Sequence, residues 1–257
     1  MRLCRIATEQ LADRNVTLEV KSYKTAKEAC TAAASGKADA SFCLRRNELD
    51  LYNGVDLPKL NNARSVFYRP YGVYSSTHDS LREIQQGATV AIPNDDEGRG
   101  RALLLLQQEG VITLNEPDRL DAHTYELAEN SLGIQFRETD AAQLPAMLAE
   151  VDYVILDPST SDGEGASDGE GASDGEGASS GESASSKGSA KKGLGVADAI
   201  VIEASDSVAA KRYAGIVSID PDRSDDEHVK ALTKVLKSTE FNEYLQKAYG
   251  QELIPIT

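Results

Sequence analysis

Residues 88–106, with the sequence ATVAIPNDDEGRGRALLLL, predict a buried strand that passes through a polar turn into a helix. Val90 and Ile92 are β-branched and follow a turn signal at Gly87. The strand should end at Pro93, because proline has no N–H to donate to a sheet ladder. The four leucines at the end cover every side of a helix, so we expect that helix to be buried against a sheet. This order of elements is typical of an α/β fold.

The turn between this strand and helix is a candidate anion site. A helix N-terminus presents free backbone N–H groups and the positive end of the helix dipole, and both favour a bound carboxylate or phosphate. Arg99 and Arg101 could add forked guanidinium donors to the same anion. The alternative is that Asn94 or Asp95 only caps the helix and that both arginines are solvated. On the motif alone the alternative is favoured, because few helix N-termini hold a ligand.

Composition restricts the class of protein. The chain has 257 residues, which allows one large domain or two small lobes, and a net charge of −15. This charge argues against nucleic acid or an anionic membrane surface as a partner. The sequence contains no apolar run that could span a bilayer or serve as a signal peptide. The three cysteines, Cys4, Cys30 and Cys43, have no metal-ligand spacing, so we expect small apolar core residues and neither a metal nor a cofactor.

Helix and strand patterns alternate along most of the chain. It opens on a helix pattern at residues 6–12, and apolar and polar residues then alternate as in a strand at Val16–Val20. An α/β sheet normally begins with a strand before the first helix, so we interpret the start of the sequence as truncated or assigned too late. Further strand-like segments are residues 38–44, 65–75, 134–137, 151–156, 199–203 and 213–219.

A low-complexity segment interrupts this alternation. The hexamer SDGEGA begins at Ser161 and repeats at Ser167 and Ser173, followed by two degraded copies. The hexamer has nothing apolar to bury, so we expect residues 159–198 to form a flexible, acidic Gly/Ser-rich linker. A calcium-binding repeat is disfavoured, because such repeats carry an apolar position that packs inside a β-helix.

Several segments together resemble the NlpA/MetQ family, the methionine-binding lipoproteins of bacterial ABC importers. Their order and spacing agree with the family across nearly the whole chain apart from the repeat. The segments that carry the resemblance are Tyr71-Gly72-Val73-Tyr74-Ser75 and residues 87–95, 99–106, 110–114, 141–145 and 249–255.

The resemblance implies a two-lobed α/β fold, the periplasmic-binding-protein type II fold, with a ligand cleft between the lobes. Residues 1–74 and 199–257 would form one lobe and residues 75–158 the other, with two crossovers as the hinge. Relatives have a signal peptide, a lipid-modified cysteine and a first strand before the helix with which this chain opens. None of these is present in the sequence, so we expect the first strand of the fold to be missing.

The function implied by the resemblance is that of a substrate-binding component, not an enzyme. Such a protein binds methionine or a related amino acid and delivers it to an ABC permease and its ATPase. The implied location is the cell envelope, either lipid-anchored at the outer face of the cytoplasmic membrane or periplasmic. Contact with a membrane would come only through a lipid anchor.

The expected ligand site combines residues that match the family with residues that depart from it. Arg101 matches the arginine that holds the amino-acid carboxylate, and Asn94 and Tyr71 are also kept. Asp157 stands where the family has a pair of asparagines, and it could accept a hydrogen bond from an ammonium group. The alternative for Asp157 is that it only starts a turn before Pro158.

The largest departures from the family are Arg45, at the usual histidine, and Glu48, at the usual tyrosine. Both are expected to line the cleft, although two residues three apart could also simply pair at the surface. The altered pocket and the start of the chain leave open a degenerate paralogue, kept as a surface or interaction protein. An α/β enzyme that binds phosphate is least favoured, because the sequence offers no nucleophile–base pair and Gly98-Arg99-Gly100 lacks phosphate-loop spacing.

Overall fold

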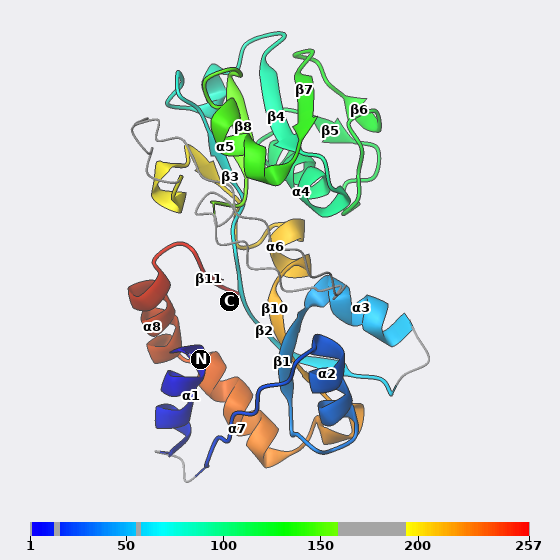
Figure 1. Ribbon diagram of the computed structural model, residues 1–257, viewed down its shortest axis with the longest axis vertical. Helices are drawn as coiled ribbons and strands as arrows, with labels where there is room; N and C mark the ends of the chain where they lie inside the picture. Colours follow the sequence, from blue (N-terminus) through cyan, green and yellow to red (C-terminus); the bar gives the residue numbers. More distant parts are fainter. Residues whose placement is uncertain (1, 13–15, 55–57, 159–193, 257) are drawn as a thin grey trace, which may run out of the picture.

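The computed structural model describes residues 2–12, 16–54, 58–158 and 194–256. They form two α/β lobes, each built around its own sheet and joined by crossing segments of the chain (Figure 1). We call the lobe with the four-stranded sheet the first lobe and the lobe with the five-stranded sheet the second lobe. In the part of the chain that the structure describes, no helix combines the length and apolar character needed to cross a membrane.

The first lobe has an antiparallel sheet with helices on both faces. Its strand order is β1-β10-β2-β11, and its helices flank the sheet (Figure 1). Val66 and Val217 pack on the side of α1, α7 and α8, whereas Ile216 packs against Cys30 of α2 and Leu49 of α3. This alternation is the two-residue period of a strand covered on both faces. The strands are β1 (Ser41–Arg45), β2 (Asn61–Tyr68), β10 (Gly215–Ile219) and β11 (Ile254–Pro255), and the helices are α1 (Arg2–Ala12), α2 (Ala26–Ala34), α3 (Arg46–Gly54), α6 (Val208–Arg212), α7 (Glu227–Leu236) and α8 (Thr239–Tyr249), with a 3₁₀ turn at Pro221–Arg223.

The second lobe has a mixed sheet in the order β7-β4-β8-β3-β9. Strand β4 runs parallel to β7 and β8, while β3 is antiparallel to β8 and β9. A two-stranded sheet, β5 and β6, lies beside it. The strands are β3 (Gly72–Tyr74), β4 (Thr89–Pro93), β5 (Thr113–Leu114), β6 (Leu127–Glu129), β7 (Gln135–Thr139), β8 (Tyr153–Leu156) and β9 (Val201–Ile202), and the helices are α4 (Asp96–Gln108) and α5 (Leu144–Met147), with 3₁₀ turns at Leu81–Glu83, Ala141–Gln143 and Val196–Asp198.

The strand–turn–helix unit predicted for residues 88–106 is confirmed. Strand β4 ends at Pro93, and Asp95 caps α4 by accepting a hydrogen bond from the Gly98 N–H at 2.8 Å. Residues 103–106, the leucine run, are all buried. The helix ends before Gly110, whose φ of +72° suits a residue without a side chain. Helix α4 is therefore an internal helix that presents its first two turns to the junction between the lobes.

The division of the chain between the lobes differs from the sequence-based one at two strands. Residues 72–74 and 201–202 form β3 and β9 of the second-lobe sheet, although both segments were assigned to the first lobe. Strand β3 lies between β8 and β9, so backbone hydrogen bonds fix it in that sheet. The first crossover is therefore residues 69–71, directly before β3. Structure also begins earlier than expected after the repeat, because Val196–Asp198 forms a 3₁₀ turn and Val196 is buried. The linker prediction for residues 159–193 lies outside the described residues.

The strand predicted at Val16–Val20 is wrong. No strand pairing occurs there, but Val16 and Leu18 pack against the first-lobe core while Thr17 and Glu19 are exposed. The alternation of apolar and polar residues therefore indicates only that one face of this segment is buried. A strand ladder also requires a neighbouring strand with which the backbone can form hydrogen bonds. Among the described residues, β1 is the outermost strand of its sheet and pairs only with β10.

Candidate functional site

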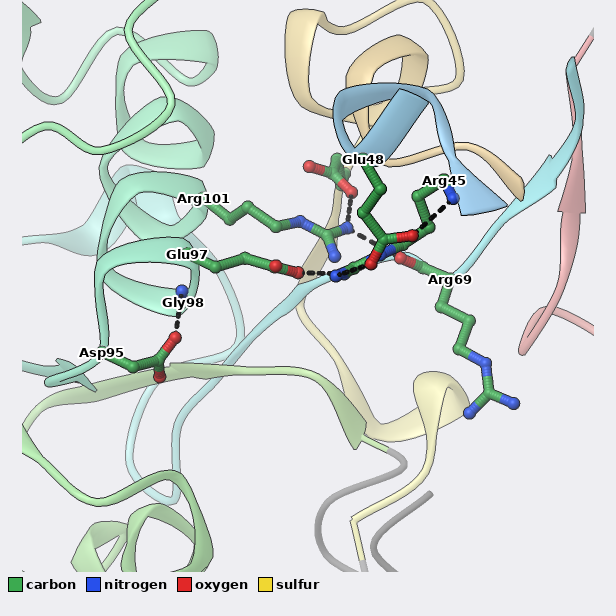
Figure 2. Close-up of polar contacts among 8 residues, drawn as sticks. Arg45, Glu48, Arg69, Asp95, Glu97, Gly98 and Arg101 are labelled. Carbon is green, nitrogen blue, oxygen red and sulfur yellow. Dashed lines mark hydrogen bonds and ion pairs between the residues drawn. The ribbon is translucent and has the colours of Figure 1, made fainter. Parts of the chain in front are cut away.

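Arg101 lies at the junction of the two lobes, where it connects α4 to both chain crossovers (Figure 2). Its Nη2 donates to Glu203 Oε2 at 2.5 Å and to the Arg69 carbonyl oxygen at 2.8 Å. Arg69 follows β2 in the first crossover, and Glu203 follows β9 in the return crossover. The Arg101 and Glu203 side chains are only 5% and 1% exposed. The pair therefore links α4 to both crossovers in a buried environment.

Two tyrosine rings contact the same guanidinium. The Arg101 Cζ atom is 4.2 Å from the centre of the Tyr71 ring and 4.8 Å from that of Tyr213. Tyr71 comes directly before β3 of the second lobe, whereas Tyr213 ends α6 of the first lobe. A cation over an aromatic face is stabilised by the ring quadrupole, more so when both are shielded from water. Arg101 is thus held by groups from both lobes.

Burial sets the electrostatics of this site. It raises the pKa of the Glu203 carboxyl, and the adjacent Arg101 acts in the opposite direction. Burial alone would lower the pKa of Arg101, but the charge of Glu203 and the hydrogen bond to it outweigh burial and hold that pKa above its ordinary value. The guanidinium therefore stays charged, and its charge is matched by a carboxylate in a shielded environment.

The buried pair keeps one donor and one acceptor without a partner. Arg101 Nε and Glu203 Oε1 are both buried and make no hydrogen bond to the described residues. A buried polar atom without a partner costs free energy, because it has lost its hydrogen bonds to water. A molecule that brings a carboxylate for one atom and an ammonium group for the other would satisfy both.

A second ion network joins the lobes beside Arg101. Arg45, at the end of β1, donates through Nε and Nη2 to Glu48 Oε1 at 3.1 and 2.8 Å. Its Nη1 pairs with Glu97 in the first turn of α4 (Figure 2). Burial would lower the pKa of Arg45, but Glu48 and Glu97 together raise it. The pairing of Arg45 with Glu48 that the sequence left open is present, and a contact to the other lobe is added to it.

The remaining candidates lie at the carboxyl ends of neighbouring strands. Asn94 follows β4 and is exposed; its backbone N–H donates to the Thr139 carbonyl oxygen at 2.9 Å. Asp157 follows β8, and its charge contributes to raising the pKa values of Tyr71 and Arg101, so it lies within electrostatic reach of both. Ligands of open α/β sheets bind at this edge. The structure therefore places Tyr71 against Arg101, with Asp157 at the carboxyl end of β8 within electrostatic reach of both.

Arg99 faces a different way from Arg101. Its Nη1 donates to the Asn94 carbonyl oxygen at 3.0 Å and its Nε to that of Ala122 at 3.3 Å, both inside the second lobe. It also pairs with Asp96 at 2.5 Å and with Glu138 at 3.5 Å. Of the two arginines in the turn, Arg101 is the one that reaches the junction.

Glu203 and Tyr213 were missed by the sequence-based analysis. The available signal for Glu203 was its position as a charged residue at the end of the apolar segment Ala199-Ile200-Val201-Ile202. A carboxylate that is buried with such a segment needs a partner. Nothing local to Tyr213 indicates its contact with α4, since the two are more than a hundred positions apart in the chain. Long-range pairing of this kind emerges only from the fold.

Two hollows of the described residues lie away from Arg101. One, of about 200 Å³, is lined by residues including His78, Gln86 and Asp152, at the amino ends of β4 and β8. The other lies around Asn115 and Arg119. In the described ranges there is also no group of three His, Cys, Asp or Glu side chains placed to hold a metal ion. Because the side chains of Arg101 and Glu203 are almost completely buried, a ligand at Arg101 would need the lobes or their side chains to move apart.

The contact between Arg45 and Glu97 should be weak and sensitive to salt. Their side chains are 38% and 34% exposed, and ion pairs at such exposure typically contribute about 0.2–1 kcal/mol. A double-mutant cycle with Arg45→Gln and Glu97→Gln, measured by urea unfolding, should give a coupling in that range that disappears at about 1 M salt. A coupling that persists in high salt would contradict the solvent-screened geometry.

Comparison with known proteins gives consistent similarities. The sequence model of the NlpA lipoproteins matches residues 2–162. The chain is 27% identical over 237 residues to the probable D-methionine-binding lipoprotein MetQ of Pasteurella multocida, covering 92% of this chain and 75% of that protein.

Two solved structures are similar over nearly their full length. A putative lipoprotein from Ruminococcus gnavus is 30% identical, with a TM-score of 0.61 and coverage of 100% of this chain and 94% of that one. A nutrient-binding protein from Burkholderia cenocepacia, solved bound to methionine, is 25% identical, with a TM-score of 0.60 and coverage of 100% and 95%. The α/β fold described above is the fold of these two proteins.

Proposed function

The chain belongs to the NlpA lipoprotein family, and from this we propose that it is the substrate-binding component of an ABC importer for methionine or a related amino acid. It binds the amino acid between the lobes and delivers it to an ABC permease and its ATPase, without catalysing a reaction. In this proposal it acts in the cell envelope, as the lipoprotein names of its relatives suggest.

The observation that carries this proposal is the buried pair of Arg101 and Glu203, with one unpartnered atom on each side. A free α-amino acid brings a carboxylate for Arg101 Nε and an ammonium group for Glu203 Oε1. Asp157, at the end of β8, adds a second carboxylate near the ammonium group. Charge-assisted hydrogen bonds of this kind are about twice as strong as neutral ones. The site therefore suits a zwitterion better than an isolated phosphate.

Ligand entry requires the junction to open. Arg101 and Glu203 are almost completely buried, and Arg45 holds Glu97 across the lobes. Rotation of the lobes about the two crossovers, at residues 69–71 and after β9, would break the partly exposed Arg45–Glu97 contact and uncover the buried pair. Binding proteins of this architecture close around their ligands by such hinge motions. The Arg45–Glu97 contact would then favour the closed arrangement.

A second candidate function follows from the same contacts. By the family resemblance, Arg45 and Glu48 stand where relatives have a histidine and a tyrosine. Arg45 pairs with Glu48 and also with Glu97 rather than pointing at an open site. A chain whose lobes are tied in this way could have lost transport and kept its fold as a surface or interaction protein. Ligand binding separates the two candidates.

Calorimetric titration with L-methionine and a panel of other amino acids and short peptides tests the proposal. We expect heat and a saturable isotherm for at least one free α-amino acid. The same compound with its carboxylate amidated should not bind, because Arg101 would lose its anionic partner. If folded protein gives no heat with any member of the panel, the transport proposal fails and the interaction module is favoured.

The proposed contact of Asp157 with the ammonium group of the ligand can be tested separately. Asp157→Asn should weaken binding of the preferred amino acid by about 10–100-fold, the range expected for loss of one hydrogen bond to a charged group. Asp152→Asn is the matched control, because Asp152 lies at the opposite end of β8, where its carboxylate accepts from the Thr89 N–H at 2.8 Å. Equal affinities for the two variants would remove Asp157 from the site.

A further inference from the structure

Two cysteines of the first lobe form a close thiol pair. Cys30 on α2 and Cys43 on β1 are free, and their sulfur atoms are 3.1 Å apart. The sulfurs of a disulfide lie about 2.05 Å apart, so a small movement of two side chains would bring them to bonding distance. Helix α2 packs directly on β1, so the contact joins two neighbouring elements. In the sequence these cysteines have no metal-ligand spacing, so the sequence alone predicts only small apolar core residues.

The two thiols differ in access to solvent. Cys30 is completely buried, whereas Cys43 is partly exposed. Cys43 Sγ also lies 3.6 Å from Ser41 Oγ and 3.6 Å from the Ala26 carbonyl oxygen. A molecule in solution can therefore reach Cys43 first, while Cys30 is reached only through Cys43.

The pKa shifts of the two thiols indicate the same order of reaction, with Cys43 before Cys30. The hydrogen bond from Cys30 lowers the pKa of Cys43, against the opposing effect of burial. The hydrogen bond to Cys43 and burial both raise the pKa of Cys30. Since the thiolate is the nucleophile in thiol chemistry, Cys43 is the attacking sulfur and Cys30 the protonated neighbour that stabilises it.

We propose that Cys30 and Cys43 are a reversible redox pair, which a low-molecular-weight disulfide such as oxidised glutathione converts to an intramolecular disulfide. The Cys43 thiolate attacks one sulfur of the oxidant, its S–S bond breaks, and one glutathione thiolate leaves. Cys30 then loses its proton to solvent and attacks the Cys43 sulfur, which expels the second glutathione thiolate. Two protein thiols are oxidised and one glutathione disulfide is reduced, so atoms and electrons balance.

The second step is made easier by the first. Part of the rise in the Cys30 pKa comes from the charge of the Cys43 thiolate. Once Cys43 is in the mixed disulfide it carries no charge, so this contribution is removed and Cys30 can ionise more readily. The pair therefore has the arrangement of an attacking and a resolving cysteine.

The disulfide would fix an edge strand that leads into the lobe junction. Strand β1 is the outermost of the described strands of its sheet and ends at Arg45, which contacts Glu97 of the second lobe. Cross-linking residues thirteen positions apart restricts the unfolded chain and stabilises the folded one. We expect the oxidised form to melt roughly 5–10 °C higher and β1 to exchange its amide hydrogens more slowly.

Treatment of the folded full chain with oxidised glutathione tests the proposal. Intact-mass measurement should show loss of two hydrogens, and peptide mapping should show Cys30 linked to Cys43, with Cys4 read separately. Dithiothreitol should reverse the change. Cys30→Ser should stop at a glutathione adduct on Cys43, and Cys43→Ser should leave Cys30 unmodified.

The wild-type result decides the matter without either variant. A persistent glutathione adduct on Cys43, or no reaction at Cys43 in the time that free cysteine reacts, would overturn the proposal. Modification of Cys30 in the Cys43→Ser chain as fast as Cys43 in the Cys30→Ser chain would overturn the assigned order of attack. Circular dichroism of both variants, before oxidation, checks that the compared chains are folded.

Discussion

Replacing Arg101 by methionine is expected to lower the free energy of unfolding by about 3–5 kcal/mol, the cost typical of removing one partner of a buried ion pair. The loss arises because Glu203, 1% exposed, would remain as a buried carboxylate without its cation. The Arg69 carbonyl oxygen would also lose its donor, and the rings of Tyr71 and Tyr213 would lose the charge between them. Urea unfolding monitored by tyrosine fluorescence or circular dichroism measures the change.

The loss should depend on pH in a defined direction. Burial already raises the pKa of Glu203 above its value in the unfolded chain, and removal of Arg101 takes away the group that opposes this rise. In the variant, the folded state therefore binds a proton more tightly than the unfolded state. The destabilisation should be greatest above the folded-state pKa and should shrink as pH falls through it.

Two controls separate the ion pair from general damage to the fold. The double variant Arg101→Met with Glu203→Leu should recover most of the lost stability, because no buried charge is left alone. Arg99→Met should cost less, since Asp96, one of its partners, is 77% exposed and remains solvated. If the double variant is no more stable than Arg101→Met, unpaired charge is not the cause of the loss.

The substitution Gly100→Ala should also lower the free energy of unfolding by about 3 kcal/mol or more, although alanine is the better helix former. A Cβ atom at position 100 would lie 1.7 Å from the Leu120 carbonyl oxygen and 2.6 Å from its carbonyl carbon. Both are backbone atoms and cannot rotate away, so α4 or the loop would have to move. Thermal or urea unfolding measures the loss.

Gly54→Ala is the matched control for Gly100→Ala. Gly54 also lies in a helix, but a Cβ there would meet nothing within 4 Å. Its stability should stay within about 0.5 kcal/mol of wild type or rise slightly. An equally small effect of Gly100→Ala would mean that α4 does not pack on the Leu120 backbone as described.

This packing explains the glycines of Gly98-Arg99-Gly100. At Gly98 a Cβ would lie 2.5 Å from the Pro93 Cβ, and at Gly100 it would meet Leu120. Both glycines permit close approach of α4 to its neighbours inside the second lobe. Their spacing differs from that of a phosphate loop, and the structure gives them a packing reason for being glycine.

Local signals in the sequence predicted the second lobe better than the first. Pro93, the leucine run and Gly110 are local signals, because each can be interpreted from the few residues around it. The strand, turn and helix that they predict are all present. Val16–Val20 has an equally regular pattern but no strand pairing, because a ladder depends on a neighbour elsewhere in the chain. The positions of β3 and β9 likewise depend on pairing with β8 and with each other.

The candidate site was predictable only in part for the same reason. Arg101 belongs to a recognisable helix start, and the structure places it at the lobe junction. Its partner Glu203 is 102 positions away, and Tyr213 reaches it from the other lobe through α6. For Arg45, sequence spacing indicated the contact with Glu48 but not the one with Glu97, which is 52 positions away.

Binding of the preferred amino acid to Arg101→Lys and Arg99→Lys, measured by calorimetry, tests the central claim most directly. Lysine keeps the charge that Glu203 needs but lacks the planar fork that can hold Glu203 and a ligand carboxylate together. Arg99→Lys should bind with an affinity similar to wild type, whereas Arg101→Lys should bind about 10–100-fold more weakly, with both chains folded. Wild-type affinity in Arg101→Lys would contradict the assignment of Arg101 as the group that holds the ligand carboxylate.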